Sequence, residues 1–192
     1  MLQNHAQTPL NHLQLDAPRC ALLAILGTVA ENPSPFDKLL EKARASAAPL
    51  WCPVMDVMEC AFHKAHARDM FQAFVPSRYL DRSTPYVLSK HGWASFRELM
   101  SGGIKDSHPL AGACIVLKLQ FIYHVEEHRQ ADILNEIEQH LTCERRSAVE
   151  AVQMCEQKPA EGFACSSELA RINCGLAWIQ RLRHKRQSEC TA

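Results

Sequence analysis

The amino-acid sequence predicts an α+β fold in which a small mixed sheet is flanked by N-terminal and C-terminal helices. Between residues 50 and 125 the chain contains short β-branched or aromatic runs broken by proline and glycine, which is typical of strands. Before and after that region, apolar residues recur at the three- and four-residue spacing of amphipathic helices. The longest β-like run covers residues 114–125 and is rich in Ile, Val, Leu and aromatic residues, so we expect a long, buried strand there.

Composition and charge narrow the class of protein. With 192 residues, of which 47% are hydrophobic and 22% charged, the chain suits one soluble domain with a helical extension. Its formal net charge is zero, so attraction to DNA has to come from local clusters of cations. The longest apolar run, residues 21–30, is too short to span a bilayer, which leaves at most peripheral membrane contact.

Nine cysteines are present, but their spacing contains neither a CxxC motif nor a paired zinc-ligand pattern. Because this number is odd and no secretory signal is seen, we expect reduced, structural thiols in a cytoplasmic protein. The inner face of the inner membrane is the alternative location. His63 and His66 have a spacing that allows metal binding on a helix but more often marks a surface pair.

The first two segments are predicted from local signals. Residues 1–17 are polar and form a flexible N-terminal arm, and residues 18–48 form a helical extension. Asp16 is placed to cap the first helix, and Pro18 suits its first turn. A second helix begins near Ser34 and ends before Pro49.

Residues 49–142 are predicted to form the core domain. Residues 54–57 and 71–75 are strand candidates, and residues 93–100 form a short helix that ends at a glycine pair. An all-helical alternative, with residues 114–125 as a buried helix, stays open because a short apolar run fits either structure. The helix after this run has one apolar face, formed by Ile133, Leu134, Ile137 and Leu141.

Residues 143–192 are predicted to form further helices with a basic end. Cations and one tryptophan on the last helix, together with cations on loops before the sheet, are candidate contacts to DNA backbone or unstacked bases. These candidates are Arg78, Arg82, Lys90, Arg171, Trp178, Arg181, Arg183, Lys185 and Arg186. The alternatives are solvated loop cations, cations that complement a helix dipole, and a packed tryptophan.

The exit of the predicted long strand carries four ionisable residues where a helix begins, and helix N-termini attract phosphate groups. In an enzyme, Glu126 and Glu127 would hold a divalent metal that activates water and offsets phosphate charge. Arg129 would stabilise charge on phosphoryl oxygens, and His128 would transfer a proton. The alternative is an ordinary helix start at which the two glutamates complement the dipole.

Three features stand out between residues 96 and 141: a glycine-containing helix end, a His-Pro pair before the predicted strand and an acid-His-Arg turn after it, at residues 101–103, 108–109 and 126–129. In these features the segment resembles the ParB/sulfiredoxin superfamily. A glutamate replaces the family glycine of that turn, and a carboxylate repels phosphate unless a divalent cation lies between them. The resemblance implies a ParB/sulfiredoxin-like core that binds ATP and Mg²⁺, with Gly102, Gly103 and Arg129 at the nucleotide.

In its size, cysteine content and terminal helices the chain is similar to plasmid fertility inhibition factors of the oncogenic suppression type. This resemblance implies a plasmid-encoded protein that blocks conjugative transfer of DNA, including T-DNA, through a type IV secretion system. It also implies DNase and ATPase activities on the transfer intermediate. Two alternatives are a non-catalytic inhibitor that binds the coupling protein or relaxase, and a helical accessory subunit of a secretion system.

Overall fold

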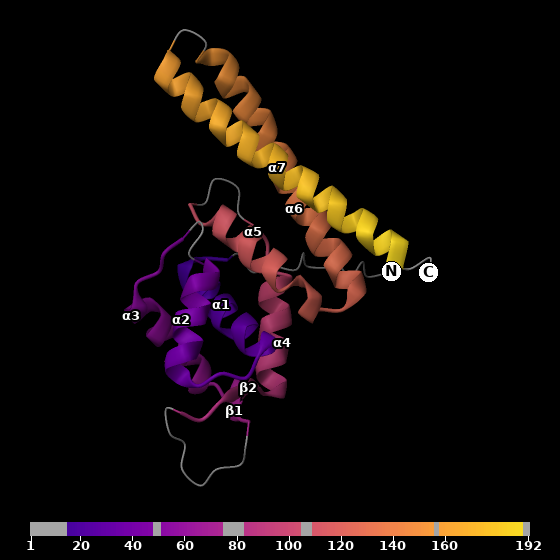
Figure 1. The fold of residues 1–192 in the computed structure, drawn as a ribbon. Helices are drawn as coiled ribbons and strands as arrows, with labels where there is room; N and C mark the ends of the chain where they lie inside the picture. Colours follow the sequence, from indigo (N-terminus) through magenta and orange to yellow (C-terminus); the bar gives the residue numbers. More distant parts are fainter. Residues whose placement is uncertain (1–14, 48–50, 75–82, 105–108, 156–157, 190–192) are drawn as a thin grey trace, which may run out of the picture. The chain divides into compact units, whose positions relative to one another are not determined.

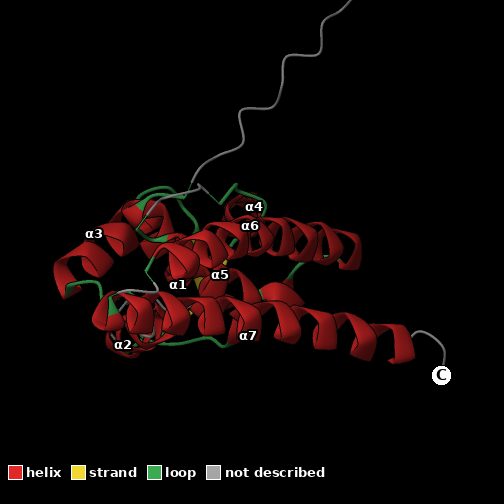
Figure 2. Ribbon diagram, turned by 90° about the horizontal axis from the view of Figure 1, so that it is seen from above, coloured by secondary structure: helices red, strands yellow, loops and turns green. Residues whose placement is uncertain are grey.

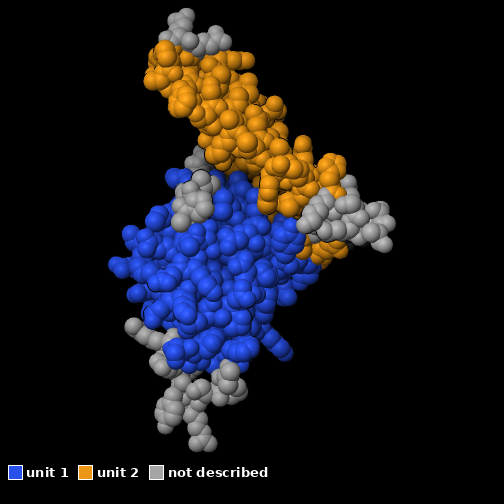
Figure 3. Space-filling view, in the orientation of Figure 1, with its two compact units in different colours: residues 1–126 blue, residues 127–192 orange. Residues whose placement is uncertain are grey.

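The computed structural model describes residues 15–47, 51–74, 83–104, 109–155 and 158–189. The chain divides into two compact units, residues 1–126 and residues 127–192, coloured separately in Figure 3. Each unit is described by itself. Within the described ranges helix predominates, as Figure 2 shows, and the sheet consists of two short strands. The α+β class is therefore confirmed in its general form, as a mostly helical protein with a small two-stranded sheet.

Unit 1, residues 1–126, is built around α1, Ala17–Glu31. This helix contacts α2 (Phe36–Ala47), α3 (Met55–His66), α4 (Lys90–Met100) and α5 (Ala111–Gln120) (Figure 1). The carboxylate of Asp16 accepts a hydrogen bond from the amide of Arg19 at 3.0 Å, which confirms the predicted cap. Because α1 is apolar on nearly all sides, it is buried as the central helix of the unit.

A two-stranded hairpin follows α3. Strands β1 (Phe71–Ala73) and β2 (Tyr86–Leu88) pair antiparallel, with Phe71 opposite Leu88, and Tyr86 also forms an isolated bridge to Ser34. Ser89 then joins the hairpin to α4, because its hydroxyl accepts from the Gly92 amide at 3.0 Å and donates to the Asp69 carbonyl at 2.6 Å. The strand predicted at residues 71–75 is thus confirmed for Phe71–Ala73, and the helix predicted at residues 93–100 is confirmed as part of α4.

The predicted strand at residues 114–125 is wrong, because this segment forms α5 and a short 3-10 helix, η1 (Ile122–His124). The alternative of a buried helix is confirmed. Residues three or four apart, including Cys114, Leu117 and Phe121, are buried together. A Cβ atom at Gly27 would lie 2.2 Å from the Phe121 ring, so the absence of a side chain on α1 makes room for this ring. The strand around which the ParB/sulfiredoxin resemblance was drawn is therefore a helix.

The predicted strand at residues 54–57 is also wrong. Val54 is the N-cap of α3, and the segment continues as the first turn of that helix. The reason is visible in the four buried residues of α3, which recur at helical spacing and face α1 and α2: Met58, Ala61, Phe62 and Ala65.

Unit 2, residues 127–192, is a helical hairpin of α6 (Glu127–Met154) and α7 (Pro159–Glu189) (Figure 1). The predicted apolar face of the first helix is confirmed, because all four of its residues are buried. The expected domain boundary after residue 142 falls inside α6, which runs on without a break to Met154. No helix of the described ranges has both the length and the apolar composition needed to cross a membrane.

Candidate nucleic-acid interface

The acid-His-Arg segment follows a 3-10 turn rather than a strand. Glu126 lies in unit 1, where its carboxylate is 3.0 Å from Nε of Arg97, and the Arg97 guanidinium lies 5.8 Å from the centroid of the Trp93 ring. Glu127 is the acidic residue in the first turn of α6, where its charge suits the helix dipole, and His128 is exposed beside it. No group of three or more metal-ligating side chains is found among the residues that the structure describes.

The predicted nucleotide-binding glycines close the end of α4. Gly102 is buried, its amide donates to the Leu99 carbonyl at 3.1 Å, and its carbonyl accepts a hydrogen bond from the Lys118 ammonium. Neither Gly102 nor Gly103 has a positive φ. The polar backbone groups of Gly102 are therefore engaged within unit 1, and their contact with a nucleotide stays a prediction.

Two of the predicted DNA-binding arginines on α7 are paired with acids inside unit 2. Arg171 lies 2.6 Å from Glu168 and 3.5 Å from Glu144, and Arg183 lies 2.7 Å from Glu138. The hydrogen bond between Arg171 and Glu168 lowers the pKa of that carboxyl and raises the pKa of the guanidinium. Much of the local positive charge is thus compensated within the hairpin.

The other α7 candidates differ in their exposure to solvent. Arg181 is exposed, and Trp178 keeps 39% of its surface accessible. Lys185 and Arg186 belong to α7, but their side chains lie outside the described part of the chain.

The structure brings together two cations that were not predicted from the sequence. On α3 the side opposite the buried apolar residues is exposed and carries Lys64, with Arg68 just beyond the helix end. Acidic side chains, Asp56 and Glu59, occupy the first half of the same exposed side. The helical spacing of the four buried residues was the available signal, but it was hidden by the assignment of residues 54–57 to a strand.

The hairpin lies directly against α3. The amide of Met70 donates to the Ala65 carbonyl at 3.1 Å, and the Met70 carbonyl accepts from the Ser89 amide at 3.0 Å. Lys90, a predicted DNA contact, is the exposed residue that follows Ser89. Of the predicted loop cations, Arg78 and Arg82 lie outside the described residues.

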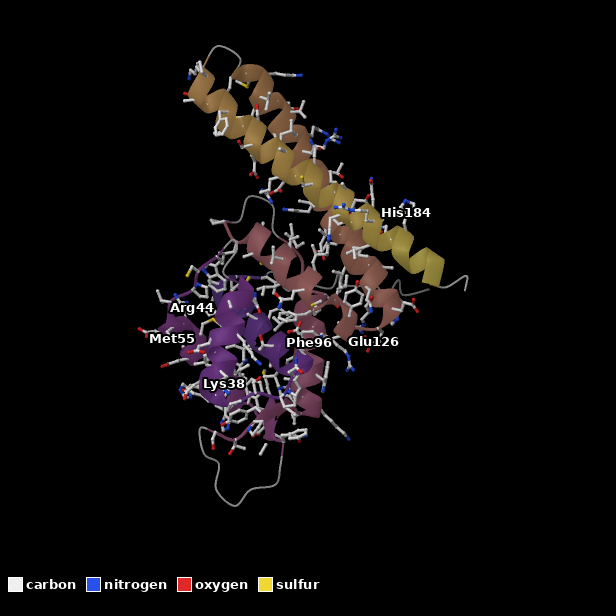
Figure 4. The ribbon with its side chains drawn as sticks, in the orientation of Figure 1. Lys38, Arg44, Met55, Phe96, Glu126 and His184 are labelled. Atoms are coloured by element: carbon white, nitrogen blue, oxygen red, sulfur yellow. The ribbon has the colours of Figure 1, made fainter. Side chains whose placement is uncertain are left out.

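A groove of about 450 Å³ runs between α1 and α3. Its lining is mostly apolar, and Arg19, Lys64 and Arg68 contribute cations to it against the one acid, Asp56. In Figure 4, Lys38, Arg44 and Met55 mark the α2 and α3 side of unit 1, whereas Phe96 and Glu126 mark the side of α4. Together, the charges on its exposed side and the lining of this groove give α3 a mixed, locally cationic surface next to the β-hairpin.

The comparisons with known proteins identify no family. No protein-family model matches the chain, and no curated protein matches it. Among solved structures, the chain is similar to Bacillus subtilis PadR in complex with operator DNA, with 13% sequence identity and a TM-score of 0.34 over 84% of this chain and 96% of that chain. A TM-score of this size does not establish a common fold.

Proposed function

We propose that unit 1 binds double-stranded DNA, with α3 in the major groove and the β1–β2 hairpin beside the phosphate backbone. The observation that carries this proposal is the arrangement of α3, a helix packed on two others with one side exposed and a two-stranded hairpin directly after it. An α-helix fits the width of the B-DNA major groove. Helix-turn-helix proteins present their second helix in this way, supported by the helix before it.

The packing of α3 on its neighbours supports the proposal that it is held rigidly enough to contact base edges. Its apolar side contacts α1 and α2, and the Phe62 ring is 4.7 Å from the Phe36 ring of α2. The connection between α2 and α3, residues 48–54, is longer than the three- or four-residue turn typical of helix-turn-helix motifs. The arrangement that we propose is therefore a winged variant with a longer connection between the two helices, rather than the compact motif.

The charged side chains on α3 and around the hairpin indicate which of them would contact the DNA phosphates and which would contact the bases. Lys64, Arg68 and Lys90 are exposed cations near the hairpin and would contact phosphates. Asp56 and Glu59, in the first half of α3, repel phosphates but accept hydrogen bonds from the amino group of cytosine. We therefore expect weak non-specific binding and a dependence on a particular base sequence.

Selection from a random pool of duplex DNA, followed by titration of the selected duplex at several salt concentrations, tests this proposal. The double variant Lys64→Ala/Arg68→Ala should bind more weakly and flatten the log–log salt dependence by about 0.9 for each phosphate that the protein no longer neutralises. The matched control is Arg145→Ala/Arg146→Ala, which removes two exposed cations from unit 2. Failure to enrich any duplex, or equal effects of the two double variants, would contradict DNA binding through α3.

The enzymatic expectations rest on the acid-His-Arg segment and on the resemblance. DNase and ATPase activities, the Mg²⁺ and ATP sites at Glu126, Glu127 and Arg129, a ParB/sulfiredoxin core and inhibition of conjugative transfer all stay predictions. A cleavage assay on highly purified protein, with labelled single- and double-stranded DNA with and without magnesium, tests the activity. Duplex binding without magnesium-dependent cleavage would support a binding protein over a nuclease.

A further inference from the structure

Two cysteines far apart in the sequence meet in the core of unit 1. Cys20 on α1 and Cys114 on α5 are separated by 94 positions, yet their Sγ atoms lie 2.8 Å apart. Their side chains are buried, with exposed fractions of 0% and 2%. Because the two cysteines lie on different helices, no short sequence motif predicts that they are neighbours.

The surroundings give the two sulfur atoms different protonation properties. The hydrogen bond between the two sulfur atoms raises the pKa of Cys20 and lowers the pKa of Cys114. Burial acts to raise the pKa of Cys114, whereas the nearby ammonium of Lys118 acts to lower it and so favours the thiolate. Lys118 follows Cys114 by one helical turn, is fully buried, and donates to the Gly102 carbonyl.

The geometry is close to that of a disulfide. A disulfide bond has a sulfur–sulfur length of about 2.05 Å, so the two Sγ atoms, 2.8 Å apart, need to approach by only about 0.8 Å. The helices that carry them, α1 and α5, already contact each other.

We propose that Cys20 and Cys114 form a redox modification site that a peroxide converts into an intramolecular disulfide. The Cys114 thiolate attacks one peroxide oxygen, the O–O bond breaks, and with one proton the products are a sulfenic acid and water. The Cys20 sulfur then displaces hydroxide from the sulfenic acid, and its thiol proton leaves in the second water. Two electrons pass from the two sulfur atoms to the peroxide, which is reduced to water.

A second thiol pair serves as an internal comparison. In unit 2, Cys155 and Cys165 lie 3.8 Å apart and are partly exposed. The pKa of Cys155 is raised, first by desolvation and then by its hydrogen bond with Cys165. Peroxide reaches this pair more easily, but no buried lysine lies beside it. Selective oxidation of Cys20 and Cys114 would therefore show that stabilisation of the thiolate matters more for reactivity than exposure to solvent.

The test uses the full chain, treated with hydrogen peroxide, alkylated with N-ethylmaleimide under denaturing conditions and mapped by mass spectrometry of peptides. A Cys20–Cys114 cross-linked peptide is expected, with a mass about 2 Da below the sum of its reduced parts. The midpoint of thermal unfolding should rise by about 5–15 °C, because the bond closes a long loop, and dithiothreitol should reverse the rise.

Single variants separate the role of Cys114, which attacks the peroxide, from that of Cys20, which then forms the disulfide. In Cys20→Ala the reaction should stop at a Cys114 sulfenic acid, trapped by dimedone, whereas Cys114→Ala should leave Cys20 unoxidised. The control Cys155→Ala/Cys165→Ala should still form the core disulfide. Exclusive formation of a Cys155–Cys165 disulfide, or alkylation of both core cysteines after oxidation of the wild type, would overturn the proposal. The peptide map of the wild type shows whether the core disulfide forms, even if a core variant does not fold. Its outcome does not depend on whether the protein binds DNA.

Discussion

The ring of Phe62 on α3 stacks on the ring of Phe71 on β1, with their centroids 5.1 Å apart and their planes 13° apart. Tyr86 of β2 completes the cluster by meeting the Phe62 ring edge-on at 5.4 Å. This contact sets the position of the hairpin against α3. The proposed DNA-binding surface therefore depends on a small aromatic cluster beneath it.

Phe62→Ala should destabilise the protein by about 3–5 kcal/mol, because a large buried ring is replaced by a cavity. Urea unfolding measures the change. Phe163→Ala is the matched control, since Phe163 is 77% exposed and its removal should change the free energy of unfolding by less than about 0.5 kcal/mol. Equal effects of the two variants would show that the Phe62 cluster does not support the fold.

Gly92→Ala should cost about 3 kcal/mol of unfolding free energy. A Cβ atom at this position would lie 2.1 Å from the Met70 carbonyl oxygen, which is backbone and cannot turn aside. Gly175→Ala provides the comparison, because there the nearest neighbour is a side-chain methyl of Leu141 at 3.2 Å. In helix α7 the added methyl group should be tolerated and can gain helix propensity. Thermal unfolding of both variants distinguishes these outcomes.

Acid should weaken the contribution of Arg171. The pKa of Glu168 is lowered in the folded protein by its hydrogen bond with Arg171, so the pair stabilises the fold above the ordinary glutamate value of 4.5. This contribution is lost as the pH falls through the lowered pKa. Since both side chains are substantially exposed, the difference between wild type and Arg171→Ala should be below about 1 kcal/mol at pH 7 and smaller still at pH 3. A difference that grows on acidification would contradict this assignment.

If α7 also contacts nucleic acid, its arginines should not contribute equally. Arg183 is held by Glu138 at 2.7 Å and by the Asn135 amide oxygen at 2.5 Å, whereas Arg181 is exposed. Arg181→Ala should therefore reduce the salt slope of DNA binding by about 0.9, and Arg183→Ala by less. Fluorescence anisotropy at several salt concentrations gives both slopes, and unchanged slopes in both variants would remove α7 from the interface.

Local signals predicted several elements well. The side-chain cap at Asp16 and the end of α4 just before the glycine pair involve only neighbouring residues. The apolar face of α6 was equally clear, because Ile133, Leu134, Ile137 and Leu141 repeat at helical spacing. The candidate site was predicted less well, since only Lys90 of the described hairpin and α3 cations was named beforehand.

The sequence by itself determined where apolar segments lie and where helices are capped, because these depend on residue type and on contacts over three or four positions. Tertiary structure alone decided that residues 114–120 are helical, because a short apolar run can be buried equally well as a strand or as a helix. The space at Gly27 that receives the Phe121 ring belongs to a helix about ninety residues earlier. The pairing of Cys20 with Cys114 has the same origin, since only the packing of α1 on α5 brings those two sulfur atoms together.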